Sequence, residues 1–183
     1  SALMLSLLPD YADPLRLCAL GKAYEGVIPL AELARLAPLL TSTEGEAAFA
    51  LVFETDSDGR PSVTVRVRAS LPLQCQRCLG TVVHEVDANA RLVVVAGPDE
   101  AGRLEEDVDP LLVGDDKLAL RSLLEDELIL AIPPAPMHPP EVCEVDLRAL
   151  NEKREDRRDP ADAGIEHPFA ALADWRRDTN NRD

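Results

Sequence analysis

The sequence predicts an α+β domain: an antiparallel β-meander of three or more strands, covered by two or three helices and followed by a flexible, charged C-terminal tail. Two patterns predict it. Apolar and polar residues alternate over 62–73 and again over 82–94, which is the two-residue period of half-buried strands. Leucines recur every three or four residues over 118–131, the period of an amphipathic helix. A sheet with one apolar face needs a cover, which helices from either end of the chain can supply.

Length and charge narrow the class of protein. The chain has 183 residues, 34 of them acidic and 19 basic, so its net charge is −15. This length favours one domain, which we place at 1–150. A surface this acidic repels phosphate backbones and argues against broad binding of nucleic acid.

The location of the protein is expected to be cytoplasmic. No uncharged apolar run approaches the roughly 18 residues that a membrane helix needs. Residues 1–8 are apolar but lack the basic start of a secretory signal. We therefore expect no contact with a membrane, and no motif indicates a small-molecule substrate.

The first half of the chain supplies one helix and the meander. Leucines and alanines after Pro29 recur at helical spacing and predict a short helix over 30–40. The polar turn at 56–59, which ends in glycine, predicts a hairpin between the first two strands. The strands of the meander are expected at 46–53, 62–73 and 82–94.

The second half begins with a segment rich in glycine, proline and acidic residues, 97–109, which is expected to be a mobile loop. The long helix follows over 118–131, capped by Asp115 or Asp116, and the prolines after Ile132 end it. The charged residues of this helix, Arg121, Glu125, Asp126 and Glu127, are expected to lie in solvent. We therefore interpret the acidic run Glu125-Asp126-Glu127 as a solvated face rather than a catalytic pair.

Residues 151–183 form the expected tail. The first part is dense in charge and predicts a solvated linker. A short apolar motif follows at 167–175 and contains the only tryptophan, Trp175, together with Phe169. This motif is either a helix that docks on the domain or a segment offered to a partner through these two aromatic residues.

A Cys-x-x-Cys motif, Cys75 and Cys78, falls at the turn between the second and third strands, with Gly80 two residues further on. In a thioredoxin-like redox motif a helix follows the first cysteine, whereas a strand pattern follows here, so a redox role is the less favoured interpretation. In a zinc knuckle two thiolates lie on a tight hairpin turn, and Gly80 would let the backbone curl so that its amides point at the sulfurs. The motif therefore predicts half of a metal site.

The other half is expected after the long helix. Zinc requires four ligands, and the proline-rich segment contains His138 and Cys143. A Cys₃His zinc site made of these two residues with Cys75 and Cys78 would join this segment to the end of the sheet. The alternative is that the thiols are reduced and without metal, and that His138 is a polar turn residue. The remaining cysteine, Cys18, lies in an apolar context and is expected in the core.

Three arginines are candidates for contact with RNA or a partner. Arg66 and Arg68 lie on the polar face of the second strand, and Arg77 lies in the Cys-x-x-Cys turn. They would form a small basic spot at the end of the sheet; the alternative is that they pair with acidic residues of the neighbouring strand. No nucleophile elbow or phosphate-binding glycine loop is present, so we expect no enzymatic activity.

Several blocks occur in an order that resembles the YceD family, the large ribosomal RNA subunit accumulation proteins. The resemblance spans residues 8–175, and it implies a non-enzymatic protein of bacteria and plastids that is needed for accumulation or processing of the large-subunit (23S) ribosomal RNA. It also implies a partner, because genes of this kind commonly lie beside one for a small, basic protein of the large subunit. The blocks that carry the resemblance are Cys75-Gln76-Arg77-Cys78, Glu125 to Pro133, Pro136-Met137-His138, Cys143-Glu144-Val145 and Pro168 to Ala173.

Charge and resemblance together leave three hypotheses. A protein at −15 that affects ribosomal RNA can act by holding or delivering a basic ribosomal protein or a nuclease, or by binding a pre-50S particle, through its acidic surface. Alternatively, it binds RNA directly through Arg66, Arg68 and Arg77 beside the cysteine turn. The least favoured hypothesis is a thiol redox protein acting through Cys75 and Cys78.

Overall fold

The computed structural model describes residues 8–106, 108–113 and 117–145. The chain divides into two units, Ser1–Cys143 and Glu144–Asp183, and the elements below belong to the first. The expected boundary at residue 150, the linker and the motif with Phe169 and Trp175 lie outside the described residues.

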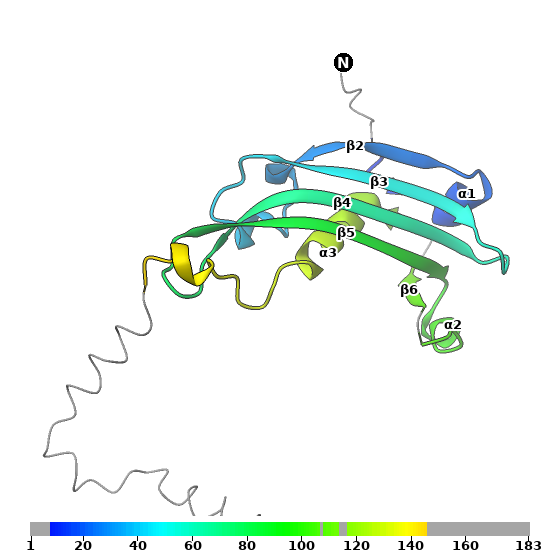
Figure 1. Cartoon of the computed structure of the whole chain (residues 1–183). Helices are drawn as coiled ribbons and strands as arrows, with labels where there is room; N and C mark the ends of the chain where they lie inside the picture. Colours follow the sequence, from blue (N-terminus) through cyan, green and yellow to red (C-terminus); the bar gives the residue numbers. More distant parts are fainter. Residues whose placement is uncertain (1–7, 107, 114–116, 146–183) are drawn as a thin grey trace, which may run out of the picture. The chain divides into compact units, whose positions relative to one another are not determined.

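A five-stranded sheet with the order β2-β3-β4-β5-β6 dominates the first unit (Figure 1). The large strands are β2 (Ala23–Pro29), β3 (Glu46–Thr55), β4 (Pro61–Gln74), β5 (Thr81–Val95) and β6 (Asp109–Leu112). The helices are α1 (Pro14–Ala19), α2 (Pro98–Ala101) and α3 (Leu120–Leu130). Two short strands, β1 (Tyr11–Ala12) and β7 (Leu118–Ala119), pair with each other. The predicted α+β class is confirmed.

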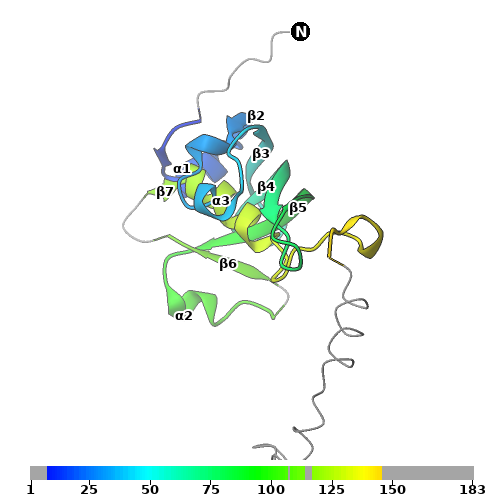
Figure 2. The same cartoon turned by 90° about the vertical axis from the view of Figure 1, so that its left-hand side faces the viewer.

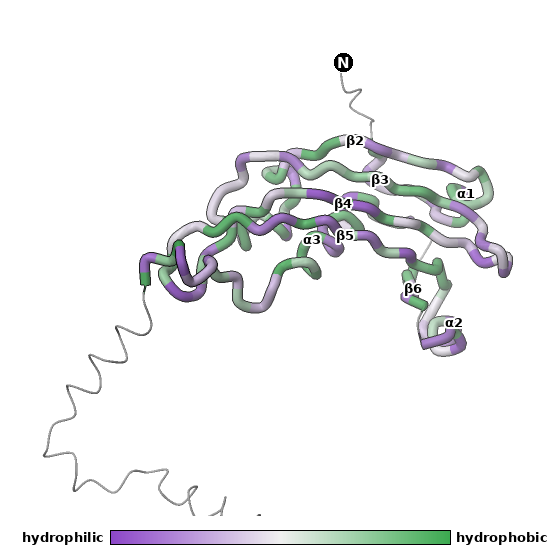
Figure 3. The backbone as a smooth tube through the Cα atoms, viewed as in Figure 1, coloured by the Kyte–Doolittle hydropathy of each residue, from purple (hydrophilic) through white to green (hydrophobic). Residues whose placement is uncertain are grey.

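The predicted meander is β3-β4-β5, and its pairs are antiparallel throughout. Hydrophobic and hydrophilic residues alternate along β4 and β5 (Figure 3), so that one face of β4 is buried from Val63 to Leu73 while Arg66, Arg68 and Ser70 point to solvent. Helices α1 and α3 lie against the buried face (Figure 2) and contribute leucines to the same core. The open face of the sheet is therefore polar.

Two strands of the sheet were not predicted. Strand β2 adds an antiparallel partner to β3, and β6 pairs with β5 in parallel, which makes the sheet mixed. The expected mobile loop over 97–109 is wrong in part, because it contains α2 and the first residue of β6. Pro98 occupies the first turn of α2 and two acidic residues follow it, which suits a helix start.

The helix expected over 30–40 is wrong. The structure has two 3₁₀ turns there, Leu30–Glu32 and Ala37–Leu39, although Leu30 and Leu33 are fully buried as the spacing suggests. Pro38 prevents a continuous helix because it lacks an N–H and restricts the residue before it.

Helix α3 confirms the predicted apolar stripe, since Leu120, Leu124 and Leu128 have no exposed surface. Its start is different from the expectation: Ala119 is the N-cap, and the expected caps at 115 and 116 lie outside the described residues. The prediction for Glu125 is also wrong, because this residue is 5% exposed. Among the described residues, no helix is long and apolar enough to cross a membrane.

Candidate metal centre

The turn between β4 and β5 brings the Cys-x-x-Cys motif to one end of the sheet. Cys75 directly follows β4, and the turn is closed by two backbone hydrogen bonds: Leu79 N donates to Cys75 O over 2.9 Å, and Cys75 N donates to Gly80 O over 2.8 Å. Gly80 was expected to let the backbone curl, but the residue with the left-handed backbone is its neighbour Leu79, whose φ is 63°. Gly80 itself needs no special conformation; a Cβ there would lie 3.6 Å from Cys78 Sγ, an ordinary contact.

The proline-rich segment after α3 crosses this turn. Gln76 N donates a hydrogen bond to Pro136 O over 2.8 Å, and the backbone N of His138 lies 3.4 Å from Cys75 Sγ. The 3₁₀ turn Pro140–Val142 then positions Cys143. Prolines restrict the backbone of this segment, which helps to hold His138 and Cys143 towards the sulfurs although they are about 60 residues away in sequence.

The four predicted metal ligands converge. One ligand atom from each of Cys75, Cys78, His138 and Cys143 lies within 4.8 Å of the other three. In a tetrahedral zinc site with Zn–S bonds of about 2.3 Å, neighbouring sulfurs are about 3.8 Å apart, so a small contraction would complete that geometry around a bound metal. Cys75 is fully buried and the other three are half-buried. The predicted convergence of the two segments is confirmed.

His138 has the orientation of a metal ligand. Its Nε2 lies 2.9 Å from the backbone oxygen of Thr81, and its Nδ1 lies 3.4 Å from Cys78 Sγ. Because a carbonyl oxygen can only accept, Nε2 carries the proton and donates it, and Nδ1 keeps its lone pair. Ligating histidines typically fix their tautomer by such a bond to the ring nitrogen that does not bind the metal. Nδ1 is therefore the atom that His138 could offer to a metal.

The backbone of the site favours thiolate at one sulfur. Burial raises the pKa of Cys75, but N–H groups of Cys78, His138 and Arg77 together outweigh it and lower that pKa to about 5. The N–H of Gly80 acts to lower the pKa of Cys78, yet burial and the thiols of Cys75 and Cys143 raise it above its ordinary value. A cation among the three sulfurs would favour the thiolate form of each and remove this conflict.

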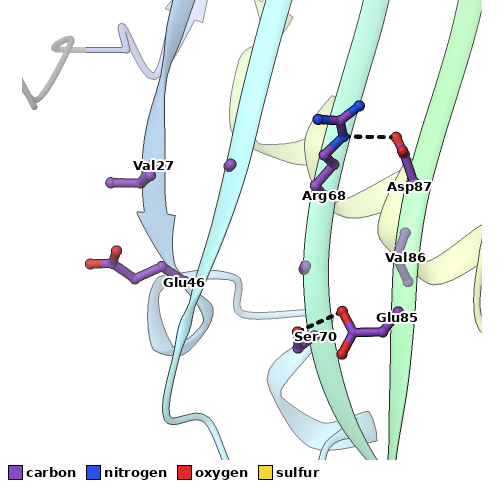
Figure 4. Close-up of a pocket in the computed structure, with 9 residues that line it drawn as sticks. Val27, Glu46, Arg68, Ser70, Glu85, Val86 and Asp87 are labelled. Atoms are coloured by element: carbon purple, nitrogen blue, oxygen red, sulfur yellow. Dashed lines mark hydrogen bonds and ion pairs between the residues drawn. The ribbon is translucent and has the colours of Figure 1, made fainter.

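The three candidate arginines do not form one cluster. Arg68 is paired with Asp87 on β5, at 3.0 Å between Nε and Oδ1 (Figure 4), as the alternative for that residue predicts. Arg66 lies opposite Ala50 and Asn89 in the sheet register. Arg77 lies in the Cys-x-x-Cys turn beyond the end of β4. Arg66 lies eight residues before that end, a distance of roughly 26 Å at about 3.3 Å per residue.

Comparison with known proteins points to one family. The family model for the large ribosomal RNA subunit accumulation protein YceD matches residues 63–175, a span that includes all four candidate ligands. A protein of Haemophilus influenzae described as "Large ribosomal RNA subunit accumulation protein YceD" is 31% identical over 139 residues, which are 75% of this chain and 80% of that protein. No solved structure matches the chain.

Proposed function

Because this chain belongs to the YceD family of large ribosomal RNA subunit accumulation proteins, we propose that it acts in accumulation of the large-subunit (23S) ribosomal RNA as a non-catalytic protein that binds a basic partner. The partner is a ribosomal protein or a pre-50S particle. The main support for a basic partner is the charge of the folded domain, whose described residues include 21 acidic and only 11 basic side chains. Such a surface attracts basic protein at long range and repels bare RNA.

Direct RNA binding has less support. Of the three arginines in that hypothesis, Arg68 is already paired with Asp87, and Arg66 and Arg77 are too far apart to bind neighbouring phosphates. The acidic side chains on the same sheet face, among them Glu46 and Glu85 (Figure 4), would oppose a phosphate backbone. The interaction with the ribosomal particle is therefore proposed to go through protein.

The metal centre is proposed to hold zinc. Three thiolates and an imidazole are the ligands of a closed structural zinc site, and thiolates select zinc over magnesium or calcium. Bound zinc would join the β4–β5 turn to the segment 136–143 and stabilise that end of the domain. We propose no catalytic step there, since all four ligand positions come from the protein.

The rRNA role is tested in a strain that lacks the chromosomal gene for this protein. Expression of the wild-type chain should restore the ratio of 23S to 16S ribosomal RNA, measured on total RNA. An unaltered ratio in the deletion strain would contradict the rRNA role.

The partner class is tested by affinity purification at low and at high salt. Ribosomal proteins or precursor particles should be recovered at low salt and released as salt screens the charges. Recovery of bare 23S RNA after protease treatment of the lysate, or of background proteins only, would contradict a basic protein partner.

The zinc proposal is tested by elemental analysis of the purified protein. The wild-type chain and the control variant Cys18→Ser should each contain about one zinc per chain, because Cys18 donates to the Ser62 carbonyl far from the turn. Cys75→Ser and Cys143→Ser should lose the metal. Equal metal content in all four proteins, or none in the wild type, would exclude this site.

A further inference from the structure

An apolar groove lies at the end of the sheet opposite the metal centre. Its volume is about 260 Å³. Figure 1 shows α1, α2 and the end of β5 at this side of the domain, and the β4–β5 turn at the other. The larger apolar residues that line the groove are Pro14, Leu15, Pro61, Val94, Val95 and Val113.

The size of the groove indicates what it can accept. It is smaller than the roughly 300–1,000 Å³ of most small-molecule sites, so it suits one or two apolar side chains. Val94 and Val95 are 5% and 2% exposed and provide a rigid wall, whereas Leu15 is 57% exposed. A buried wall beside an exposed leucine is typical of a pocket that takes an anchor side chain from a partner.

The charged residues of the groove are both acidic. Asp13 Oδ1 accepts the backbone N–H of Arg16 over 3.1 Å, and Glu100 Oε2 accepts that of Ala96 over 2.8 Å. Each carboxylate is thus fixed by one oxygen, and the structure shows no partner for the other within the described ranges. Among the residues that the structure describes, no lysine or arginine lines the groove.

The surroundings extend this negative charge. The described residues from 99 to 109 include five acidic side chains against one basic, Arg103. The nearby Arg60 is held by Asp56 and Asp58 at 3.1 and 2.8 Å. The groove therefore combines apolar walls with an acidic rim, and both must be matched by its occupant.

We propose that this groove docks a basic segment of a partner protein, in which one or two apolar side chains are flanked by lysine or arginine. The apolar side chains enter against Val94 and Val95, and the flanking cations meet Asp13 and Glu100. The inference rests on the proposed function in that the partner is basic, and it adds where that partner is held. Strand β5 has 15 residues, so at about 3.3 Å per step its two ends lie at most roughly 46 Å apart. The groove and the metal centre are at opposite ends of this strand, and substitutions in the groove should leave the metal content unchanged.

The test measures binding of two synthetic peptides to the full-length protein by fluorescence anisotropy. One peptide is Lys-Arg-Leu-Val-Lys-Arg, and in the other serines replace leucine and valine, so charge is equal. We expect the leucine-valine peptide to bind about tenfold more tightly, and Leu15→Lys to remove this preference. Leu130→Lys is the matched control, because Leu130 is a 78% exposed leucine at the end of α3 and should bind as the wild type does.

Equal affinity for the two peptides, or an unchanged preference in Leu15→Lys, would overturn the groove as the docking site. Amide shifts in an NMR titration give a second criterion, since they should centre on Val94, Val95 and Val113 and not on the β4–β5 turn. The ratio of 23S to 16S RNA in cells is a separate readout. If Leu15→Lys loses the peptide preference but keeps a normal 23S to 16S ratio, the groove binds peptide but is not used in rRNA accumulation. If Leu15→Lys keeps the peptide preference and the ratio changes, the groove is not the docking site, and the rRNA role is unaffected.

Discussion

Removal of the Glu125 carboxylate should destabilise the domain far more than removal of its neighbour on the same helix. Oε1 of Glu125 accepts the backbone N–H of Arg35 at 2.8 Å, and Oε2 accepts the guanidinium Nε at 3.3 Å. The Glu125 side chain is 7% exposed and that of Arg35 is 51% exposed. The carboxylate thus fixes the chain between the two 3₁₀ turns onto α3.

The magnitude follows from these contacts. A hydrogen bond to a charged acceptor contributes about 1.5–3 kcal/mol, while the pair with the half-exposed guanidinium adds at most about 1 kcal/mol. Glu125→Ala should therefore lower the free energy of unfolding by about 2–3 kcal/mol and the Tm by roughly 4–12 °C. Glu125→Gln keeps one acceptor for the Arg35 N–H and should lose about half as much.

Asp126→Ala is the matched control. Asp126 lies next to Glu125 on α3 and also pairs with Arg35, but its side chain is 52% exposed. The gain in helix propensity on mutation to alanine is similar at both positions, so the difference between the two variants isolates the buried contact. Urea denaturation with equal m-values should show a difference of at least about 1 kcal/mol. Equal losses in the two variants would refute the reasoning.

Three further substitutions test other parts of the structure. Leu79→Gly should raise the free energy of unfolding by about 0.5–1 kcal/mol in urea denaturation, because a left-handed leucine is strained, and Leu79→Ala should give no such gain. Burial, followed by Asp126 and Asp109, raises the pKa of Glu127; a raised pKa stabilises the fold only at low pH, so Glu127→Gln should increase the Tm at neutral pH and not below the ordinary carboxyl pKa. In metal-free protein the pKa of Cys75 is lowered to about 5 from 9.0, so the Tm advantage of the wild type over Cys75→Ser should be present above pH 9, decline as the pH falls and vanish below about 5; an advantage independent of pH would contradict a thiolate there.

The central strands and the cluster of four candidate metal ligands could be predicted from the sequence because local patterns encode them. Alternation from Val63 to Leu73 identifies β4 without knowledge of its neighbours, and a sulfur pair at a hairpin turn requires two more ligands from elsewhere. The segment with His138 and Cys143 offered both. The left-handed residue of the turn was missed, since glycine is the usual choice there and Leu79 carries no signal for it.

The wrong predictions share a physical cause, which is that contacts distant in sequence overrode local spacing. Glu125 lies in a charged run of its helix, and its buried carboxylate accepts the backbone N–H of Arg35, which is 90 residues away in sequence. Leucines three apart after Pro29 fit an α-helix and a 3₁₀ turn equally well until Pro38 is taken into account. Strand β6 contains a proline and an aspartate in four residues, so its parallel pairing with β5 has no recognisable pattern.

The ladder between β4 and β5 is continuous from Ser62↔Val93 to Gln74↔Thr81, which makes it a stiff spacer. Any single binding partner that is to occupy both ends must span its length. The 12 steps of this ladder measure roughly 40 Å, so at 3.3–3.6 Å per residue an extended peptide needs at least about 11–12 residues for that distance. A shorter peptide can contact only one end of the ladder and gains no avidity from the other, whereas a particle as large as a ribosomal subunit can contact both ends at once.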